Sequence, residues 1–192
     1  MFNLPNQLTM MRVLLIPLLV IVFYLPWEWH YLASGALFGI AALTDLLDGY
    51  LARRMSLETP FGAFLDPVAD KLIVAVALVL LLEQNASALF AIPAMVIIGR
   101  EIVVSALREW MAELGKRTSV AVSQIGKVKT VMQMVSIVVL LTFNPDVFPW
   151  FHWLGLLMLY IAAILTMWSM WIYLKAAWPE FNRTTPVDVS KE

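Results

Sequence analysis

The chain contains no cysteine and few charged residues. The absence of cysteine among its 192 residues excludes disulfides, thiolate nucleophiles and thiolate metal sites. Only 14% of the residues are charged, whereas 61% are hydrophobic and the mean hydropathy is +0.82. A protein of this size cannot bury so much apolar surface in its own core, so we expect lipid to act as its solvent. The two histidines, His30 and His152, lie in short connections beside tryptophans, where we expect a structural or interfacial role.

Six apolar stretches are each long enough to cross a hydrocarbon layer of roughly 30 Å, which takes about 20 helical residues. We predict an all-α fold, an integral membrane bundle of six transmembrane helices with both termini cytoplasmic. We expect the helices to form one domain over residues 1–178, and residues 179–192 to be a polar cytoplasmic tail. The predicted spans are residues 8–25, 31–51, 64–82, 88–111, 124–143 and 150–174.

Basic residues are missing from three of the connections between these spans. Residues 26–30, 83–87 and 144–149 include acidic side chains but no Lys or Arg, so all thirteen basic residues fall on the other side of the predicted membrane. The positive-inside rule then places both termini in the cytoplasm. We expect tryptophans at both interfaces: Trp27, Trp29, Trp150 and Trp153 outside, and Trp110 and Trp178 inside.

Four aspartates lie in the second and third predicted helices. At about 100° per residue, Asp45 and Asp48 fall within roughly 60° of one another on the second helix. Asp66 and Asp70 are i,i+4 neighbours on the third. A short turn near residues 56–60 makes the two helices antiparallel, so we expect the two pairs to face each other. Either of two prolines, at positions 60 and 67, suits the start of the third helix.

Carboxylates inside the apolar layer of a membrane need a counter-charge. A charged Asp near the bilayer centre costs about 2.5 to 3.5 kcal/mol, and four clustered like charges repel one another. A metal-free cluster in an aqueous pocket would lower the first cost but keep the repulsion. Two divalent cations would cancel four carboxylates, and all-oxygen ligation favours Mg²⁺ or Mn²⁺. We therefore expect a dimetal site.

Small residues lie among the aspartates. Gly49, Ala52 and Gly62 leave room for a large polar ligand to approach the backbone. Glycine and alanine also allow close helix packing in membranes, but their position on the same helix faces as the aspartates favours ligand binding.

Together these residues resemble the defining motif of the CDP-alcohol phosphotransferase family at every fixed position. The six-helix plan is also similar to the fold of that family, so the resemblance covers nearly the whole chain. The matching residues are Asp45-x2-Asp48-Gly49-x2-Ala52-Arg53-x8-Gly62-x3-Asp66-x3-Asp70.

The resemblance implies a role for each motif residue. Asp45, Asp48 and Asp66 would hold the two metals, and Asp70 would contribute to the metal site and act as general base. CMP would be the leaving group, and the two metals would stabilise the attacking and leaving oxygens. The CDP group would be bound by Asp48, Gly49, Ala52, Arg53 and Gly62.

Basic residues in the fourth and fifth predicted helices bear on the acceptor alcohol. Arg100 lies deep in an apolar helix, where a charged side chain is costly and indicates a binding partner or a functional site. In one interpretation Arg100 pairs with a helix carboxylate, and Arg108, Lys127 and Lys129 are ordinary cytoplasmic flank charges. We expect flank positions of this kind for Lys116, Arg117 and Lys129. We favour the interpretation that Arg100, Arg108 and Lys127 form an anion pocket beside the metals, because guanidinium groups bind phosphate in bidentate geometry. Such a pocket suits a phosphorylated acceptor.

Four stretches resemble the bacterial phosphatidylglycerophosphate synthases within this family. This resemblance implies transfer of a phosphatidyl group from CDP-diacylglycerol to sn-glycerol 3-phosphate, giving phosphatidylglycerophosphate and CMP. It also implies a multi-pass protein of the bacterial inner membrane, surrounded by membrane lipids, with its active site facing the cytoplasm. We further expect a homodimer and no nucleic-acid partner. The stretches are NLPNQLTMMR from residue 3, FGAFLDPVADK from residue 61, GREIVVSALREW from residue 99 and GKVKT from residue 126.

Other interpretations remain open. Within the family, the acceptor could instead be an inositol phosphate or serine. Outside it, intramembrane carboxylates also mark cation-transport pathways. Transport should leave acidic groups along an exit route, but the sequence has none between Asp70 and Glu83. A catalytically silent scaffold would show scattered polar residues and not a filled motif.

Overall fold

The computed structural model describes residues 4–55, 60–113 and 124–181, and within these ranges helices are joined by short connections and no strand is present. This confirms the predicted all-α fold class, and each predicted span overlaps one helix. The sixth helix continues through residues 179–181 of the predicted tail, and residues 182–192 lie outside the described part. The helices are α1 (Leu4–Tyr24), α2 (His30–Met55), α3 (Pro60–Asn85), α4 (Ala88–Glu113), α5 (Gln124–Thr142) and α6 (Pro149–Phe181).

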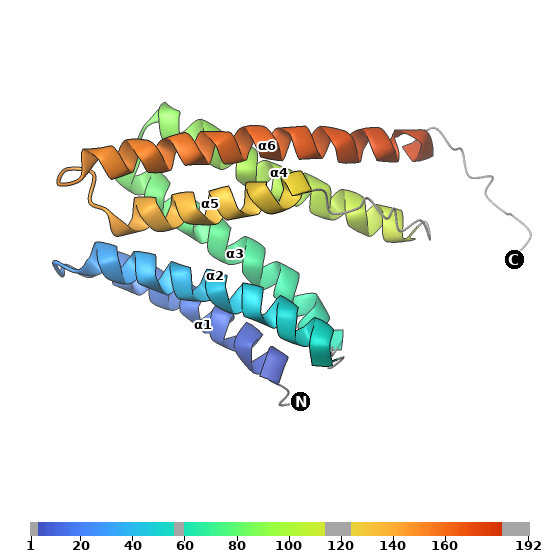
Figure 1. The fold of residues 1–192 in the computed structure, drawn as a ribbon, viewed down its shortest axis with the longest axis horizontal. Coiled ribbons are helices and arrows are strands. Elements are labelled where there is room, and N and C mark those ends of the chain that lie inside the picture. Colours follow the sequence, from blue (N-terminus) through green and yellow to red (C-terminus); the bar gives the residue numbers. More distant parts are fainter. Residues whose placement is uncertain (1–3, 56–59, 114–123, 182–192) are drawn as a thin grey trace, which may run out of the picture.

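The helices run alternately up and down the bundle (Figure 1). Helix α1 packs against α2 and α3, while α5 packs against α2 and α6, and α4 lies against α6. The first turn of α1 and the last turn of α6 lie at the same end of the bundle (Figure 1). The aspartates of α2 and α3 are near this end, because α2 finishes there and α3 begins there.

Local sequence explains where α3 begins and ends. Pro60 opens the helix, a position where its missing N–H costs nothing, while Pro67 lies inside it. After Asn85 the backbone of Ala86 has a φ of 34°, which interrupts the helical path. The Ser87 hydroxyl then accepts a hydrogen bond of 3.4 Å from the backbone N–H of Phe90 and caps α4.

Glycines allow two close helix contacts in the interior. A side chain on Gly35 of α2 would collide with Thr142 of α5, so only glycine fits there without a shift. Between α5 and α6, a Cβ on Gly155 would lie 2.7 Å from Cγ of Leu140. Close backbone approach through small residues is a common way to join helices in membranes. The Ser136 hydroxyl strengthens the second contact by donating a hydrogen bond of 2.7 Å to the Gly155 carbonyl.

The outer surface is apolar. Trp150, Trp168 and Trp171 are 86%, 62% and 70% exposed, and many Leu, Ile and Val side chains are exposed with them. So many exposed large apolar side chains are unusual for a water-soluble monomer. By length and composition, Ala88–Glu113 and the Pro149–Lys175 part of α6 could each cross a membrane. The chain is therefore a helical, membrane-associated protein.

Candidate functional site

Two motif aspartates meet at a buried arginine. Arg12 of α1 has a side chain only 1% exposed, and it lies between Asp45 of α2 and Asp70 of α3. Its Nη2 is 3.5 Å from Oδ1 of Asp45, and its Nη1 donates to Oδ1 of Asp70. The two carboxylates are about one-third exposed, at 35% and 32%. Helices α1, α2 and α3 therefore bring two carboxylates to one cation, at a place that solvent or a ligand can still enter.

The other motif residues lie on the same two helices. Asp48, Gly49, Ala52 and Arg53 belong to α2, and Gly62 and Asp66 belong to α3, but their side chains are outside the described part of the structure. Among the described side chains, no group of three or more His, Cys, Asp or Glu residues lies close enough to hold a metal ion.

The described carboxylates suit a divalent cation. Asp45 and Asp70 come from different helices, yet both contact one guanidinium group. Among the side chains that the structure describes here, two carboxylates meet one guanidinium. Carboxylate oxygens are the ligands that Mg²⁺ and Mn²⁺ prefer. Divalent cations would supply electrostatic stabilisation of the attacking and leaving oxygens.

A second charged cluster joins α4, α5 and α6. Glu101 Oε1 lies 2.6 Å from Nη1 of Arg100 and 3.2 Å from Nζ of Lys129, so two cations share one carboxylate oxygen. Arg100 also donates a hydrogen bond of 3.2 Å from Nη2 to the Ser169 hydroxyl. The side chains of Arg100 and Lys129 are only 10% and 6% exposed, and Nε of Arg100 is buried without a hydrogen-bond partner. Within the part of the chain that the structure describes, this buried cluster has two cations and one carboxylate.

The remaining predicted acceptor residues extend this region. Arg108 donates a hydrogen bond of 2.8 Å to the Tyr173 hydroxyl of α6, and its guanidinium carbon lies 5.1 Å from the centre of that ring. Lys127 lies in α5, but its side chain is outside the described part of the structure. Lys71, which follows Asp70 directly, donates to the Ser105 hydroxyl of α4. This contact ties the aspartate helix α3 to the helix that carries the two arginines.

Sequence reasoning missed two buried cations. Lys129 was expected to be a flank charge, and this is wrong, because its side chain is buried against Glu101. The expectation failed because a lysine near a helix start can equally face lipid headgroups or a neighbouring helix. Two other expected flank charges, Lys116 and Arg117, lie outside the described residues. Arg12 was not connected with the aspartates at all, although an arginine within an apolar span signals a buried partner.

Known proteins are similar in sequence to this chain over almost its whole length. Residues 2–174 match the family described as CDP-alcohol phosphatidyltransferase. A protein of Pseudomonas fluorescens named CDP-diacylglycerol–glycerol-3-phosphate 3-phosphatidyltransferase is 57% identical over 181 residues, which cover 94% of this chain and 92% of that protein. Proteins of the same name from Salmonella choleraesuis and Shigella flexneri serotype 5b are 56% and 55% identical, each over 92% of this chain and 95% of their own length. With a family match over almost the whole chain and relatives more than half identical to it, this chain belongs to the CDP-alcohol phosphatidyltransferase family.

Proposed function

We propose that this chain transfers a phosphatidyl group from CDP-diacylglycerol to sn-glycerol 3-phosphate, giving phosphatidylglycerophosphate and CMP in phospholipid biosynthesis. The relatives above carry the name of this reaction at 55% to 57% identity. The observation that carries the proposal is the meeting of Asp45 and Asp70 at Arg12, because it brings together carboxylates from the two halves of the family motif.

Displacement at phosphorus needs little covalent help from the protein. The acceptor hydroxyl oxygen forms a new bond to the phosphorus that carries diacylglycerol, and the bond from that phosphorus to CMP breaks. Asp70 is the proposed general base, which takes the hydroxyl proton. Asp45, Asp48, Asp66 and Asp70 would hold two divalent cations, Mg²⁺ or Mn²⁺. The partial exposure of Asp45 and Asp70 supports these roles, because a substrate or ion can approach them.

The CDP group is proposed to lie over the end of α2 and the start of α3. Gly49, Ala52 and Gly62 would let it approach the backbone, while Arg53 would contact its phosphates in bidentate geometry. Asp48 would contact both the metals and the CDP group. The diacylglycerol chains would stay in the bilayer, for which the apolar outer surface of the bundle is suited.

The acceptor phosphate is proposed to bind near Arg100, Arg108 and Lys127. The surplus positive charge of Arg100 and Lys129 over Glu101 supports an anionic ligand, because an unbalanced buried charge is costly. Both arginines contact α6 one turn apart, at Ser169 and Tyr173, so they lie along the same seam between α4 and α6. This arrangement favours glycerol 3-phosphate over serine.

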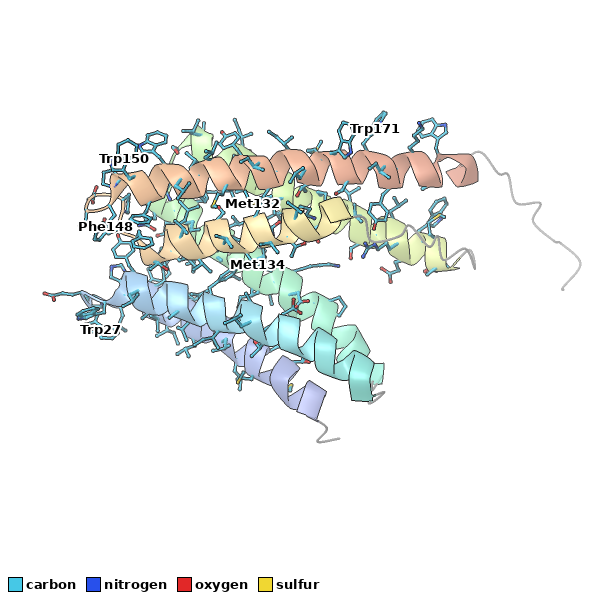
Figure 2. All side chains as sticks on the ribbon, viewed as in Figure 1. Trp27, Met132, Met134, Phe148, Trp150 and Trp171 are labelled. Carbon is cyan, nitrogen blue, oxygen red and sulfur yellow. The ribbon has the colours of Figure 1, made fainter. Side chains whose placement is uncertain are left out.

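We also propose six membrane spans in the bacterial inner membrane, with the active site and both termini facing the cytoplasm. The start of α1 and the end of α6 lie at one end of the bundle, which fits an even number of crossings (Figure 1). Trp27, Phe148 and Trp150 gather at the opposite end, as expected at an outer interface (Figure 2). The protein is proposed to be a homodimer, with apolar surface left for a second copy.

The test is to offer purified protein CDP-diacylglycerol with each candidate acceptor and to measure CMP release. We expect release with glycerol 3-phosphate and divalent cation, and its loss in excess chelator. Inositol phosphate and serine should give little release. Release with serine but not with glycerol 3-phosphate would overturn the acceptor assignment.

A further inference from the structure

Arg12 is the largest of the fully buried side chains in the described part of the protein. It lies in α1, a helix that contributes no residue to the family motif. A buried guanidinium is strongly unfavourable unless charged or polar groups surround it. Its burial therefore indicates a fixed position, held by the carboxylates that it contacts.

The described ion pairs of Arg12 with Asp45 and Asp70 use different nitrogens of one planar group. Nη1 contacts Asp70 and Nη2 contacts Asp45, so the guanidinium fixes both carboxylates at once. A lysine has the same charge, but it presents a single ammonium on a flexible stem and cannot fix two groups in the same geometry. The contact also joins three helices at one place.

We propose that Arg12 is a positioning residue, which sets the relative placement of the Asp45 and Asp70 carboxylates and thereby the geometry in which they bind divalent cations. This inference rests on the proposed function. Arg12 acts through the two aspartates and is not proposed to contact the substrate.

A positioning role for Arg12 and a purely electrostatic role predict opposite effects on cation binding. Removing a nearby positive charge should strengthen cation binding, because it removes a repulsion. Loss of positioning should weaken cation binding, even where the charge is kept. Arg12→Met removes both the charge and the planar group, whereas Arg12→Lys keeps the charge and removes only the planar group.

The experiment measures Mn²⁺ binding to purified protein from the electron paramagnetic resonance signal of free Mn²⁺, together with thermal unfolding and CMP release. We expect both variants to bind Mn²⁺ at least about tenfold more weakly, the usual effect of losing a residue that orients metal ligands. The rate of CMP release at saturating substrate should fall in both. The matched control is Leu19→Ala, a fully buried change on the same helix, which should lower thermal stability but leave Mn²⁺ binding unchanged.

Several outcomes would overturn the inference. Tighter Mn²⁺ binding in Arg12→Met with unchanged binding in Arg12→Lys would show a charge effect alone. Unchanged Mn²⁺ binding with lowered thermal stability in both variants would show a purely structural role. If Arg12→Met does not fold, Arg12→Lys decides the question, because only positioning predicts weaker binding in that variant. Wild-type protein that binds no Mn²⁺ would instead overturn the proposed metal site, and this inference with it.

Discussion

Buried cations occur in two electrostatically different settings in this protein. Among the described side chains, Arg12 faces two carboxylates, whereas Arg100 and Lys129 share the single carboxylate of Glu101. The first setting suits a metal cation and the second suits a phosphate. The contact of Lys71 with Ser105 joins the helices that carry them. A metal-activated lipid phosphate and a phosphorylated acceptor would thus have neighbouring binding regions.

Asp70→Asn should abolish turnover while keeping CDP-diacylglycerol binding. An amide cannot take the acceptor proton, and loss of a general base lowers rates by about 10² to 10⁴-fold. Binding should persist because the proposed CDP contacts lie elsewhere in the motif. The measurements are CMP release and thermal stabilisation by CDP-diacylglycerol, with Asp146→Asn in the exposed α5–α6 connection as control. Unchanged turnover in Asp70→Asn would remove Asp70 from the base role.

Arg100→Met and Lys129→Met should each raise KM for glycerol 3-phosphate. A lost charge-assisted hydrogen bond of about 1.5 to 3 kcal/mol corresponds to roughly 10 to 100-fold. KM for CDP-diacylglycerol should change little, because its proposed site is on α2 and α3. The control is Lys175→Met, at an exposed position near the C-terminal end of α6, which should leave KM for both substrates unchanged. Equal increases for both substrates would contradict a specific acceptor site.

The sequence predicts the residues of the carboxylate motif but not all of their partners. Spacing along a helix shows that Asp45 and Asp48, or Asp66 and Asp70, share a face. It does not show that Arg12 lies against that face, because this depends on how α1 packs on α2 and α3. The burial of Lys129 is likewise a consequence of α5 packing on α6, which brings the lysine to Glu101 of α4, and not of the local sequence.

At the scale of helices, the length of an apolar stretch predicts that a helix exists better than it predicts where the helix begins and ends. Helix α1 begins at Leu4, α3 begins at Pro60 and α6 continues to Phe181, all beyond the predicted apolar spans. Hydropathy marks the part of a helix that lipid surrounds, whereas backbone hydrogen bonding continues into polar turns. The first turns of α3 are such a case, because they carry the motif and are not uniformly apolar.

Gly35→Ala should destabilise the contact between α2 and α5. An added Cβ would collide with the Thr142 side chain and lie 3.1 Å from its Cα, so the helices would have to separate. We expect a loss of about 1 to 3 kcal/mol in unfolding free energy, the usual cost of overpacking. The control is Gly99→Ala, where a Cβ meets nothing within 4 Å and helix propensity improves. Equal unfolding midpoints in detergent for the two variants would contradict the close contact.

At the scale of the whole molecule, the ends of the bundle differ in chemistry. The described connections at residues 25–29, 86–87 and 143–148 contain no Lys or Arg, and aromatic side chains gather at that end (Figure 2). The opposite end carries the motif. Substrates that are soluble in the cytoplasm should enter there, while the lipid substrate approaches from the bilayer.

The absence of cysteine makes this orientation directly measurable. Ser87→Cys in the α3–α4 connection should react with a membrane-impermeant maleimide in intact cells, because the proposed orientation places this connection outside. Lys175→Cys near the end of α6 should react only after the membrane is opened. Each variant should retain CMP release, which controls for correct folding. Labelling of Lys175→Cys in intact cells would reverse the proposed orientation.

The central claim is that carboxylates of α2 and α3 together hold divalent cations for phosphatidyl transfer. The most direct measurement is the number of Mn²⁺ ions bound per chain in the presence of CDP-diacylglycerol, for wild type and for Asp48→Asn and Asp66→Asn. Two ions in the wild type, with loss of binding and of CMP release in both variants, are the predicted result. Mn²⁺ binding that is absent from the wild type, or unchanged when either aspartate is neutralised, would contradict the claim.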